Sequence, residues 1–522
     1  MLRKLHSLES LDAVYSRPKR MAVIDVGSNS FRLIVMDYVP DTCFQLSDEI
    51  REVVRLGSGL SETKVLRASQ VELAVNTMKM YAAFCKAAGI DDVRVCATEA
   101  VRLANNHNAF LNRVRNETGL EVRILSGEEE AYYGYLAAMN STTLTDGFAM
   151  DLGGGSLEIS HIQNRQMRES VSLPLGAIRA TEDYLTGDPI DPKSAEKLDK
   201  AVRKMVAELG WFRAGPGLML IGQGGTLRNL AHIDQQFQDY PLDELHGYQL
   251  STKGLKQIYE QLLPMTVQQK RRVPGMKEDR ADITTAGCIV IRAAVEAAGF
   301  SGITICHQGM REGVFYEHFL PDTPGHLFED VRRASIYNLA NLYHFQQSHA
   351  EHVAKLALQL FDQIPADTMV CTPADRELLW AACILHDIGV TVDYNDHHKH
   401  SFYLVLNAGL PGFNHRELVL IALMTRFHRK GPVTLERFGS ILEEADAKKL
   451  LQMTACLRLA EQLDRSRDGV VHEVRVHVGG QFAQLELLVG GDGVVAEWSV
   501  LRHADIFTKA FNKQLEIVTT PL

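Results

Sequence analysis

The first half of the chain contains one sequence pattern twice, about one domain length apart. Residues 22–35 read AVIDVGSNSFRLIV, and residues 148–161 read FAMDLGGGSLEISH. Each copy has an apolar run that ends at an aspartate, a turn of small and polar residues, and a second apolar run. The repeat predicts two similar domains, each built around a strand, a tight turn and a returning strand.

The turns of this repeat have the chemistry of phosphate-binding loops. A tight turn beyond the end of a buried strand presents backbone N–H groups and hydroxyls that can surround phosphate oxygens. The aspartate before each turn, Asp25 or Asp151, can hold a divalent cation against those oxygens. A single turn of this kind is more often a plain hairpin. Two copies at this spacing favour two domains that face each other across one phosphate-binding cleft.

A third glycine-rich turn follows the apolar residues 218–221. It reads GQGGT over residues 222–226 and precedes a helical pattern that begins at Leu227. A glycine turn between a strand and the first turn of a helix is a common anion site. A similar strand is expected at residues 303–306, followed by a helix over residues 311–319.

Three consecutive glutamates lie between the two copies of the repeat. Ser126 is a suitable N-cap for a helix over residues 128–138, and Glu128, Glu129 and Glu130 occupy its first turn. All three can simply stabilise the helix dipole. Alternatively, one of them points into the cleft as a general base that activates water. Both interpretations remain open at this point.

Composition describes an ordinary globular chain with an acidic balance. The 522 residues predict three to four domains, and the hydrophobic share of 46% is enough for sizeable cores. The net charge of −10 argues against a general nucleic-acid-binding protein, and it confines a polyanionic ligand to a local basic groove. The N-terminal segment carries Arg3, Lys4 and Arg17 but no apolar run, and no segment is long and apolar enough to span a membrane. We therefore expect a cytoplasmic protein whose eight scattered cysteines are reduced.

Seven segments occur in order over about residues 20–320. They are DVGSNSFRLIV, ATEAVR (97–102), ILSGEEEA, DLGGGSLEI, LPLGAIR (173–179), GQGGT and MREGVFYE (310–317). Together they resemble the exopolyphosphatase / guanosine pentaphosphate phosphohydrolase (Ppx/GppA) family. The resemblance implies the fold of the sugar kinase, Hsp70 and actin superfamily, with two ribonuclease-H-like domains and a cleft between them.

The resemblance also implies roles for individual residues. Glu130 matches the catalytic glutamate that activates the attacking water, and Asp151 and Glu158 match the ligands of a divalent metal, Mg²⁺ or Mn²⁺. Two residues depart from the family pattern: Gln223, which is expected to narrow the terminal phosphate pocket, and His307, whose role is open. The implied phosphate-binding residues are Asp25, Gly27, Ser28, Asn29, Ser30, Arg102, Gly153, Gly154, Gly155, Ser156, Gly224, Gly225 and Thr226.

The second half of the chain is helical and rich in histidine. After a linker at residues 321–325, a periodicity of 3.6 residues at 335–343, 349–361, 377–385 and 416–426 predicts an all-α module. Histidine and aspartate suit Zn²⁺, Mn²⁺ or iron when several helices bring them together. The candidate ligands of such a transition metal are His352, His386, Asp387, His400, His428 and Asp464.

The order of these residues resembles the HD phosphohydrolase superfamily, and the segments around them are similar to the third domain of long exopolyphosphatases. Two interpretations follow. The module is either a helical domain that lengthens the polyphosphate channel and supports a homodimer, or a metal-loaded second phosphohydrolase site for nucleotides.

The predicted architecture has four parts. An actin-like domain I spans residues 1–145 and an actin-like domain II spans 146–320. An all-α HD-like domain spans 325–468, and a small α/β C-terminal domain spans 469–522. In this last domain, apolar alternation predicts two strands, and an amphipathic helix is expected over residues 504–515.

We expect the chain to be an exopolyphosphatase that removes the terminal phosphate of inorganic polyphosphate with Mg²⁺, with Glu130 as the base. The nearest alternative is hydrolysis of the 5′ γ-phosphate of guanosine pentaphosphate (pppGpp) at the same site. An alternative of another class is a phosphate or nucleotide sensor without catalysis, which the set of Glu130, Asp151 and Glu158 argues against. The expected partners are polyphosphate, or pppGpp, and a second copy of the chain; no membrane and no nucleic acid is expected.

Overall fold

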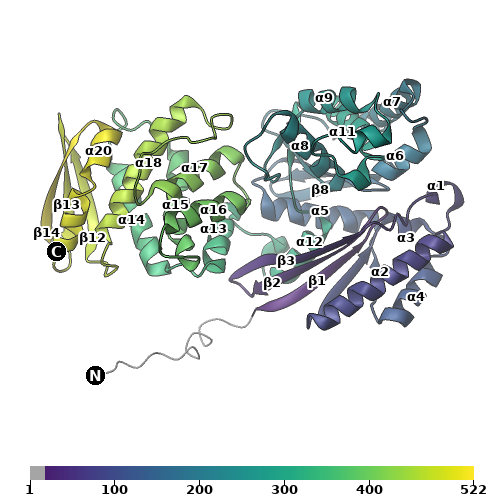
Figure 1. Ribbon diagram of the computed structural model, residues 1–522, viewed down its shortest axis with the longest axis horizontal. Helices are drawn as coiled ribbons and strands as arrows, with labels where there is room; N and C mark the ends of the chain where they lie inside the picture. The colour runs from purple at the N-terminus through teal and green to yellow at the C-terminus, as the bar shows by residue number, and fades with distance from the viewer. Residues whose placement is uncertain (1–17) are drawn as a thin grey trace. The chain divides into compact units, whose positions relative to one another are not determined.

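The computed structural model describes residues 18–522 of the chain, and Figure 1 shows its helices and strands. The N-terminal segment with Arg3, Lys4 and Arg17 lies outside the described residues. Contacts within the chain divide it into two compact units, Met1–Val331 and Arg332–Leu522, which are described separately. In the part of the chain that the structure describes, no helix is both long enough and apolar enough to cross a membrane. The four predicted domain boundaries remain predictions.

The first unit contains two mixed sheets with the same strand topology. The order of the first sheet is β3-β2-β1-β4-β5, and that of the second is β10-β11-β9-β6-β7-β8. In each, three consecutive antiparallel strands are extended by parallel strands, and β10 adds an antiparallel edge to the second sheet. This repeated topology is the predicted pair of actin-like domains. The strands are β1 (Lys19–Val26), β2 (Phe31–Val39), β3 (Cys43–Glu52), β4 (Asp92–Ala97), β5 (Val122–Ile124), β6 (Gly147–Leu152), β7 (Leu157–Gln163), β8 (Gln166–Leu173), β9 (Met219–Gln223), β10 (Gln249–Ser251) and β11 (Gly302–Ile305).

The two copies of the sequence repeat form hairpins with matching register. In the first, Asp25 at the end of β1 lies opposite Arg32 of β2. In the second, Asp151 of β6 lies opposite Glu158 of β7. The equivalent partner is therefore a cation in one hairpin and a carboxylate in the other, which gives the two turns different chemistry on the same backbone.

Helices cover both faces of the first sheet, which explains why residues 21–24 of β1 are all apolar and buried. Met21 and Val23 contribute to one hydrophobic core, and Ala22 and Ile24 contribute to another. The helices of this unit are α1 (Leu60–Thr63), α2 (Ala68–Ala87), α3 (Glu99–Leu103), α4 (His107–Thr118), α5 (Gly127–Ser141), α6 (Ala177–Tyr184), α7 (Pro192–Glu208), α8 (Gly225–Phe237), α9 (Thr252–Leu262), α10 (Val267–Lys270), η2 (Glu278–Arg280), α11 (Thr284–Ala298), α12 (Met310–Phe319) and η3 (Pro324–His326).

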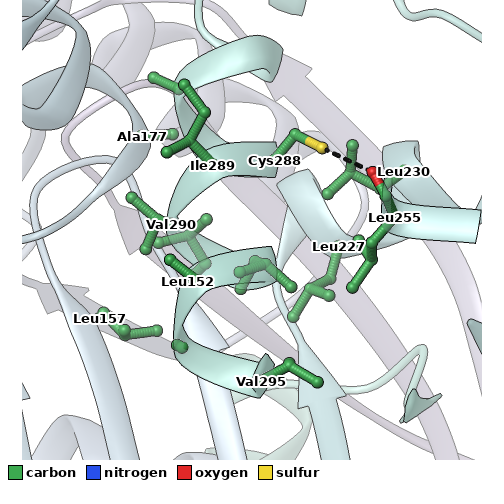
Figure 2. Close-up of a cluster of buried hydrophobic side chains, with 14 of the residues drawn as sticks. Leu152, Leu157, Ala177, Leu227, Leu230, Leu255, Cys288, Ile289, Val290 and Val295 are labelled. Atoms are coloured by element: carbon green, nitrogen blue, oxygen red, sulfur yellow. Dashed lines mark hydrogen bonds between the residues drawn. The ribbon is translucent and has the colours of Figure 1, made fainter. Parts of the chain in front are cut away.

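The core of the second sheet supports the second turn of the repeat. Figure 2 shows α11 with Ile289 and Val290 among the side chains of this core, next to Leu152 and Leu157. Leu152 and Leu157 flank the turn at residues 153–156 and are buried, so they anchor both ends of the turn. Cys288 on the same helix donates to the Leu255 carbonyl at 3.5 Å. All eight cysteines are free, in agreement with the expected reduced thiols.

The second unit consists of helices followed by a three-stranded sheet in the order β12-β13-β14. The helix predicted over residues 504–515 is shorter than expected. It ends at Phe511 because Asn512 adopts a left-handed conformation, and the residues after it form β14, which pairs in parallel with β13. The elements are α13 (Val331–Leu342), α14 (Gln347–Gln363), α15 (Pro373–Leu385), η4 (Ile388–Thr391), α16 (His397–Asn407), α17 (His415–Phe427), α18 (Glu444–Leu463), β12 (Val471–Val478), β13 (Phe482–Val489), α19 (Val494–Leu501), α20 (Ala504–Phe511) and β14 (Gln514–Pro521).

Candidate active site

A cavity of about 120 Å³ in the first unit brings the three glycine-rich turns together. Its lining includes residues 27–30, 153–156 and 224–226, together with Glu130, Asp25, Asp151 and Glu158. Of the site residues predicted in this half, Arg102 alone is absent from the lining among the described residues. The cavity therefore combines backbone turns suited to phosphate with a group of carboxylates.

Two glycines of the turns lie close to carboxylates, and Gly224 is required because a Cβ there would also lie 2.7 Å from the Leu152 carbonyl oxygen. Gly224 has φ +95°, and a Cβ there would lie 2.4 Å from Oδ1 of Asp151. A Cβ on Gly155 would lie 1.5 Å from Oε2 of Glu99. The absent side chains leave the backbone of both turns at the cavity surface, where a phosphate can reach it.

The three glutamates of α5 have three different roles. Glu129 forms a capping box with Ser126, since its carboxylate accepts from the Ser126 N–H at 2.8 Å and its own N–H donates to the Ser126 hydroxyl at 3.1 Å. Glu128 is exposed. Only Glu130 lines the cavity, with 16% of its side chain exposed. Glu129 therefore caps the helix and Glu130 faces the cavity, while the role of Glu130 as a general base remains a prediction.

Glu130 lies in an environment that disfavours its charge. Burial, followed by the nearby carboxylate of Glu158, raises the pKa of Glu130 well above its ordinary value. Arg102 opposes this effect, because its guanidinium lies 3.4 Å from Oε2 of Glu130 and also donates to the Leu125 carbonyl at 2.5 Å. Arg102 therefore contacts the predicted base, and its contact with phosphate remains a prediction.

Asp151 and Glu158 form a buried pair of carboxylates on neighbouring strands. Burial is the main cause that raises the pKa of Asp151 to about 6 and that of Glu158 to about 7. Ser172 donates to Oε1 of Glu158 at 2.8 Å and holds that side chain in place. Across the cavity, Oδ1 of Asp25 is buried and has no hydrogen-bond partner. Arg228 and Arg311 act to lower the pKa of Asp151, and Arg311 and Arg32 that of Asp25, but burial outweighs these charges and both pKa values stay raised.

Four arginines that the sequence analysis did not identify as site residues line the cavity. They are Arg32, Arg228, Arg280 and Arg311. Burial, then the charges of the other three, lowers the pKa of Arg32 well below its ordinary value. Two of these arginines were within segments of the family resemblance, Arg32 in DVGSNSFRLIV and Arg311 in MREGVFYE. Arg280 had no motif to mark it, because η2 reaches the cavity only through the tertiary fold.

The arginines have few partners within the protein. Arg311 donates to Glu49 at 3.0 Å, and Arg32 lies 3.6 Å from the same carboxylate. Arg280 donates to the Thr226 hydroxyl at 3.4 Å, while its Nε is buried without a hydrogen-bond partner. Glu312, Asp25 and Glu49 outweigh burial and raise the pKa of Arg311. Burial lowers the pKa of the other three arginines, Arg32, Arg228 and Arg280, which suits them to an anion with several negative oxygens.

The two residues that depart from the family pattern lie beside the cavity. Gln223 is buried, and its amide donates to the carbonyls of Gly134 at 3.0 Å and Gln308 at 3.1 Å. It therefore braces α5 against the loop before α12. It also lines a smaller pocket that shares Glu130, Asp151 and Glu158 with the main cavity, so the narrowing of the phosphate pocket remains a prediction. The carbonyl of His307 accepts a hydrogen bond from Arg228 and thus orients that arginine.

The comparisons with known proteins agree with this geometry. The model of the Ppx/GppA phosphatase family matches residues 34–321, more than half of the chain. The chain belongs to the Ppx/GppA phosphatase family. A second model, Ppx/GppA phosphatase domain III, matches residues 331–504, which supports the long form.

Solved structures of relatives cover the first unit of this Ppx/GppA phosphatase. The family member from Aquifex aeolicus is 27% identical, with a TM-score of 0.51, over 59% of this chain and 99% of that chain. An exopolyphosphatase from Cytophaga hutchinsonii is 23% identical, with a TM-score of 0.54, over 58% of this chain and 98% of that chain, and supports the fold. The chain is therefore a hydrolase of the phosphatase type with the actin-like two-domain fold.

The second unit of this phosphatase places the predicted metal ligands differently from the sequence prediction. His386, Asp387 and His428 come together as expected, but His349 and His397 join them. His352 and His400 do not belong to either cluster. Each lies one helical turn further along its helix, and His400 packs against Gly389 instead. Asp464 is near the cluster but accepts a hydrogen bond from Nδ1 of His349 at 2.7 Å.

The raised pKa values of the carboxylate pair predict how stability depends on pH without metal. The pKa values of Asp151 and Glu158 in the folded state, about 6 and about 7, lie above the ordinary values of 3.8 and 4.5. The folded protein therefore binds protons more tightly than the unfolded chain, and this stabilisation is lost as pH rises through the folded pKa values. It amounts to a few kcal/mol at most, at about 1.4 kcal/mol per pKa unit.

The measurement is thermal unfolding in chelator at pH 5.5 and pH 8. We expect the midpoint temperature of unfolding to be lower at pH 8 than at pH 5.5, and we expect this decrease to be larger in the wild type than in Glu158→Gln, whose side chain at residue 158 cannot titrate. Equal pH dependence in the two proteins would show that this carboxylate pair is not strained by its burial.

Proposed function

We propose that this Ppx/GppA phosphatase is an exopolyphosphatase that releases orthophosphate from the end of inorganic polyphosphate. The observation that carries the proposal is the composition of one cavity. Glu130, the pair Asp151 and Glu158, three phosphate-type turns and four arginines all line it. These are the parts that hydrolysis of a phosphoanhydride requires: a base for water, a site for a divalent cation, and donors for the equatorial oxygens.

The carboxylates fit Mg²⁺, or Mn²⁺. Asp151 and Glu158 lie opposite each other in register, and the orphaned Oδ1 of Asp25 faces the same cavity. All three groups offer oxygen, the donor that hard divalent cations prefer. Asp151 and Glu158 would hold the ion, which when bound supplies positive charge to the phosphate oxygens.

The residues of the chain account for the remaining chemistry. Glu130 accepts the proton of the attacking water at its carboxylate. As the water oxygen bonds to the terminal phosphorus, the bond from phosphorus to the bridging oxygen breaks, and the shortened chain leaves with that oxygen. Arg32, Arg228, Arg280 and Arg311 stabilise the charge on the phosphoryl oxygens, and Arg102 favours the charged form of Glu130.

Two observations favour polyphosphate over pppGpp. Lys277 lies close enough to Arg228, Arg32, Arg280 and Arg51 that, after burial, their charges lower its pKa, so the cations continue beyond the lining of the cavity. Among the described residues that line the cavity, none is aromatic, so its walls offer no ring on which a guanine can stack. A long polyanion needs cations that continue beyond the cavity, and it has no base that would need an aromatic ring.

The proposal is tested by measuring phosphate release from long polyphosphate and from pppGpp side by side, with Mg²⁺ and with chelator. We expect a higher kcat/KM for polyphosphate, no release in chelator, and a KM for polyphosphate that rises with salt, because screening weakens contacts between charged groups. A higher kcat/KM for pppGpp would replace the substrate and keep the site. No release from either substrate would contradict the proposed activity.

A further inference from the structure

A small side pocket in the first unit shares a wall with the cavity that Glu130 lines. The side pocket also takes a lysine from the end of α1, Lys64, and an arginine from α6, Arg179. A space that adjoins the proposed site of cleavage and has cations of its own is a candidate second place for an anion. The residues that line both spaces come from the two turns of the repeat and from the start of α3; among the described residues they are Ser28, Glu99, Gly154 and Gly155.

An ion pair closes the shared wall. Nη1 of Arg179 donates to Oε1 of the buried Glu99 at 3.1 Å, and Oε2 of Glu99 fills the space in front of Gly155, where a Cβ would lie 1.5 Å from it. Beside this pair, both carboxylate oxygens of Glu182 accept from the Gly59 N–H, at 3.2 and 3.1 Å. With these contacts in place the side pocket has a volume of about 20 Å³, room for little more than one water. A larger anion therefore fits only when Glu99 moves.

Glu99 is a weak partner for Arg179 compared with a phosphate. Burial raises the pKa of Glu99 even though the charges of Arg179, Arg102 and Lys64 act to lower it, so burial disfavours the charged carboxylate at this wall. Glu99 accepts one hydrogen bond from Arg179, whereas a guanidinium binds phosphate through two parallel bonds. An orthophosphate that reaches the wall can therefore displace Glu99 from Arg179.

The cations around the two spaces form separate groups. The four arginines of the cavity act on one another's charge, and Lys277 continues this group beyond the cavity lining. The charges that act on Glu99 are instead those of Arg179, Arg102 and Lys64. A polyphosphate chain bound along the four arginines would fill that side of the cavity. Orthophosphate formed at the end of the chain then needs a different way out.

We propose that the side pocket is a second phosphate site, through which the orthophosphate formed in the cleft leaves, with Arg179 and Lys64 as its cations and Glu99 as its gate. The exit role rests on the phosphate release proposed above. Orthophosphate displaces the Glu99 carboxylate from Arg179, passes the turn at Gly155 and leaves beside the exposed Lys64. The shortened chain keeps its contacts with the four arginines meanwhile and is cleaved again without leaving the cleft.

The site is tested by calorimetric titration of inorganic phosphate into the full-length protein with Mg²⁺. We expect two ions per chain in the wild type, one in the cleft and a weaker one in the side pocket. In Glu99→Gln the neutral side chain competes less for Arg179, so the weaker site should bind about tenfold more tightly, a gain that misfolding does not produce. Arg179→Gln and Lys64→Gln are expected to weaken the second site by a similar factor and to keep the first.

Asp183→Asn is the matched control for Glu99→Gln. Asp183 also lies next to Arg179, with Oδ2 3.4 Å from Nε, but among the described residues it lines neither the cavity nor the side pocket. Its loss removes the same charge beside the same guanidinium without opening the shared wall. Both phosphate affinities are therefore expected to stay within about twofold of the wild type.

The exit role is tested by using orthophosphate as an inhibitor of release from polyphosphate. A separate exit admits orthophosphate while the chain is bound, so we expect inhibition that is noncompetitive with polyphosphate, with a lower inhibition constant in Glu99→Gln. Competitive inhibition would show that the product leaves by the route by which the chain enters, and would overturn the exit role.

The outcomes separate this proposal from the proposed function. One phosphate ion per chain in both the wild type and Glu99→Gln would overturn the second site. An equal gain of affinity in Glu99→Gln and Asp183→Asn would also overturn it, because the gain would then reflect the lost charge and not an opened wall. The titration needs no turnover, so a protein that releases no phosphate from polyphosphate or pppGpp contradicts the function proposed for the cleft, while the titration alone decides the second site.

Discussion

Replacing Glu130 by glutamine is expected to lower kcat for phosphate release by about 10²–10⁴-fold, the usual contribution of a general base. Glutamine keeps the shape of the side chain but cannot take a proton from water. KM is expected to change little, because Glu130 contacts Arg102 and other carboxylates and contributes no cation to phosphate binding. The measurement is steady-state phosphate release from polyphosphate with saturating Mg²⁺.

The chain supplies a matched control two residues away. Glu128 lies in the same helical turn and carries the same charge near the helix N-terminus, but its side chain is exposed and is absent from the cavity lining among the described residues. Glu128→Gln is therefore expected to retain nearly wild-type kcat. If both variants lose the same activity, the effect belongs to the charge of the helix terminus and Glu130 is not the base.

Replacing Asp151 by asparagine is expected to have the second large effect. The variant removes one charge from the carboxylate pair that would hold Mg²⁺, so the Mg²⁺ concentration for half-maximal activity rises and activity at low Mg²⁺ falls by about 10²-fold or more. The loss should shrink as Mg²⁺ is raised, which a structural defect would not show. Phosphate release is measured across a Mg²⁺ titration for wild type and variant.

Asp146→Asn provides the control for this experiment. Asp146 precedes the same strand, β6, but its carboxylate accepts from the Asn164 N–H at 3.0 Å and lies outside the cavity lining among the described residues. Its Mg²⁺ requirement is expected to match that of the wild type. An unchanged Mg²⁺ requirement in Asp151→Asn would show that other carboxylates of the cavity hold the ion.

Periodicity and turn chemistry predicted the strands and helices next to the three glycine-rich turns and several helices of the second unit. The repeat around Asp25 and Asp151 predicted both hairpins, because a buried strand, a glycine-rich turn and a returning strand are local features. The helix that begins at Ala504 was predicted, but its end was placed at residue 515 instead of Phe511, since the amphipathic pattern continues into β14 and only pairing with β13 turns those residues into a strand.

The candidate site also has parts that the sequence predicted and parts that it did not. Motifs indicated Glu130, Asp151 and the three turns because each is a local arrangement of chain and side chain. Arg228 lies two residues beyond the GQGGT motif and was not identified, and Arg280 reaches the cavity from a segment without a motif. In the second unit, the order of histidines and aspartates predicted a metal site, but the position within each helix was wrong by one turn at His352 and at His400.

By itself, the sequence determined the repeated hairpins and the family to which the chain belongs, and it predicted that the turns of these hairpins bind phosphate. Only the tertiary structure decided which of three glutamates faces the cleft, and that Arg32 and Glu158 give equivalent hairpin positions opposite charges. It also decided that His349 and His397 complete the histidine cluster. The physical reason is that a motif fixes backbone geometry over a few residues, whereas burial, charge and convergence depend on segments that are distant in the chain.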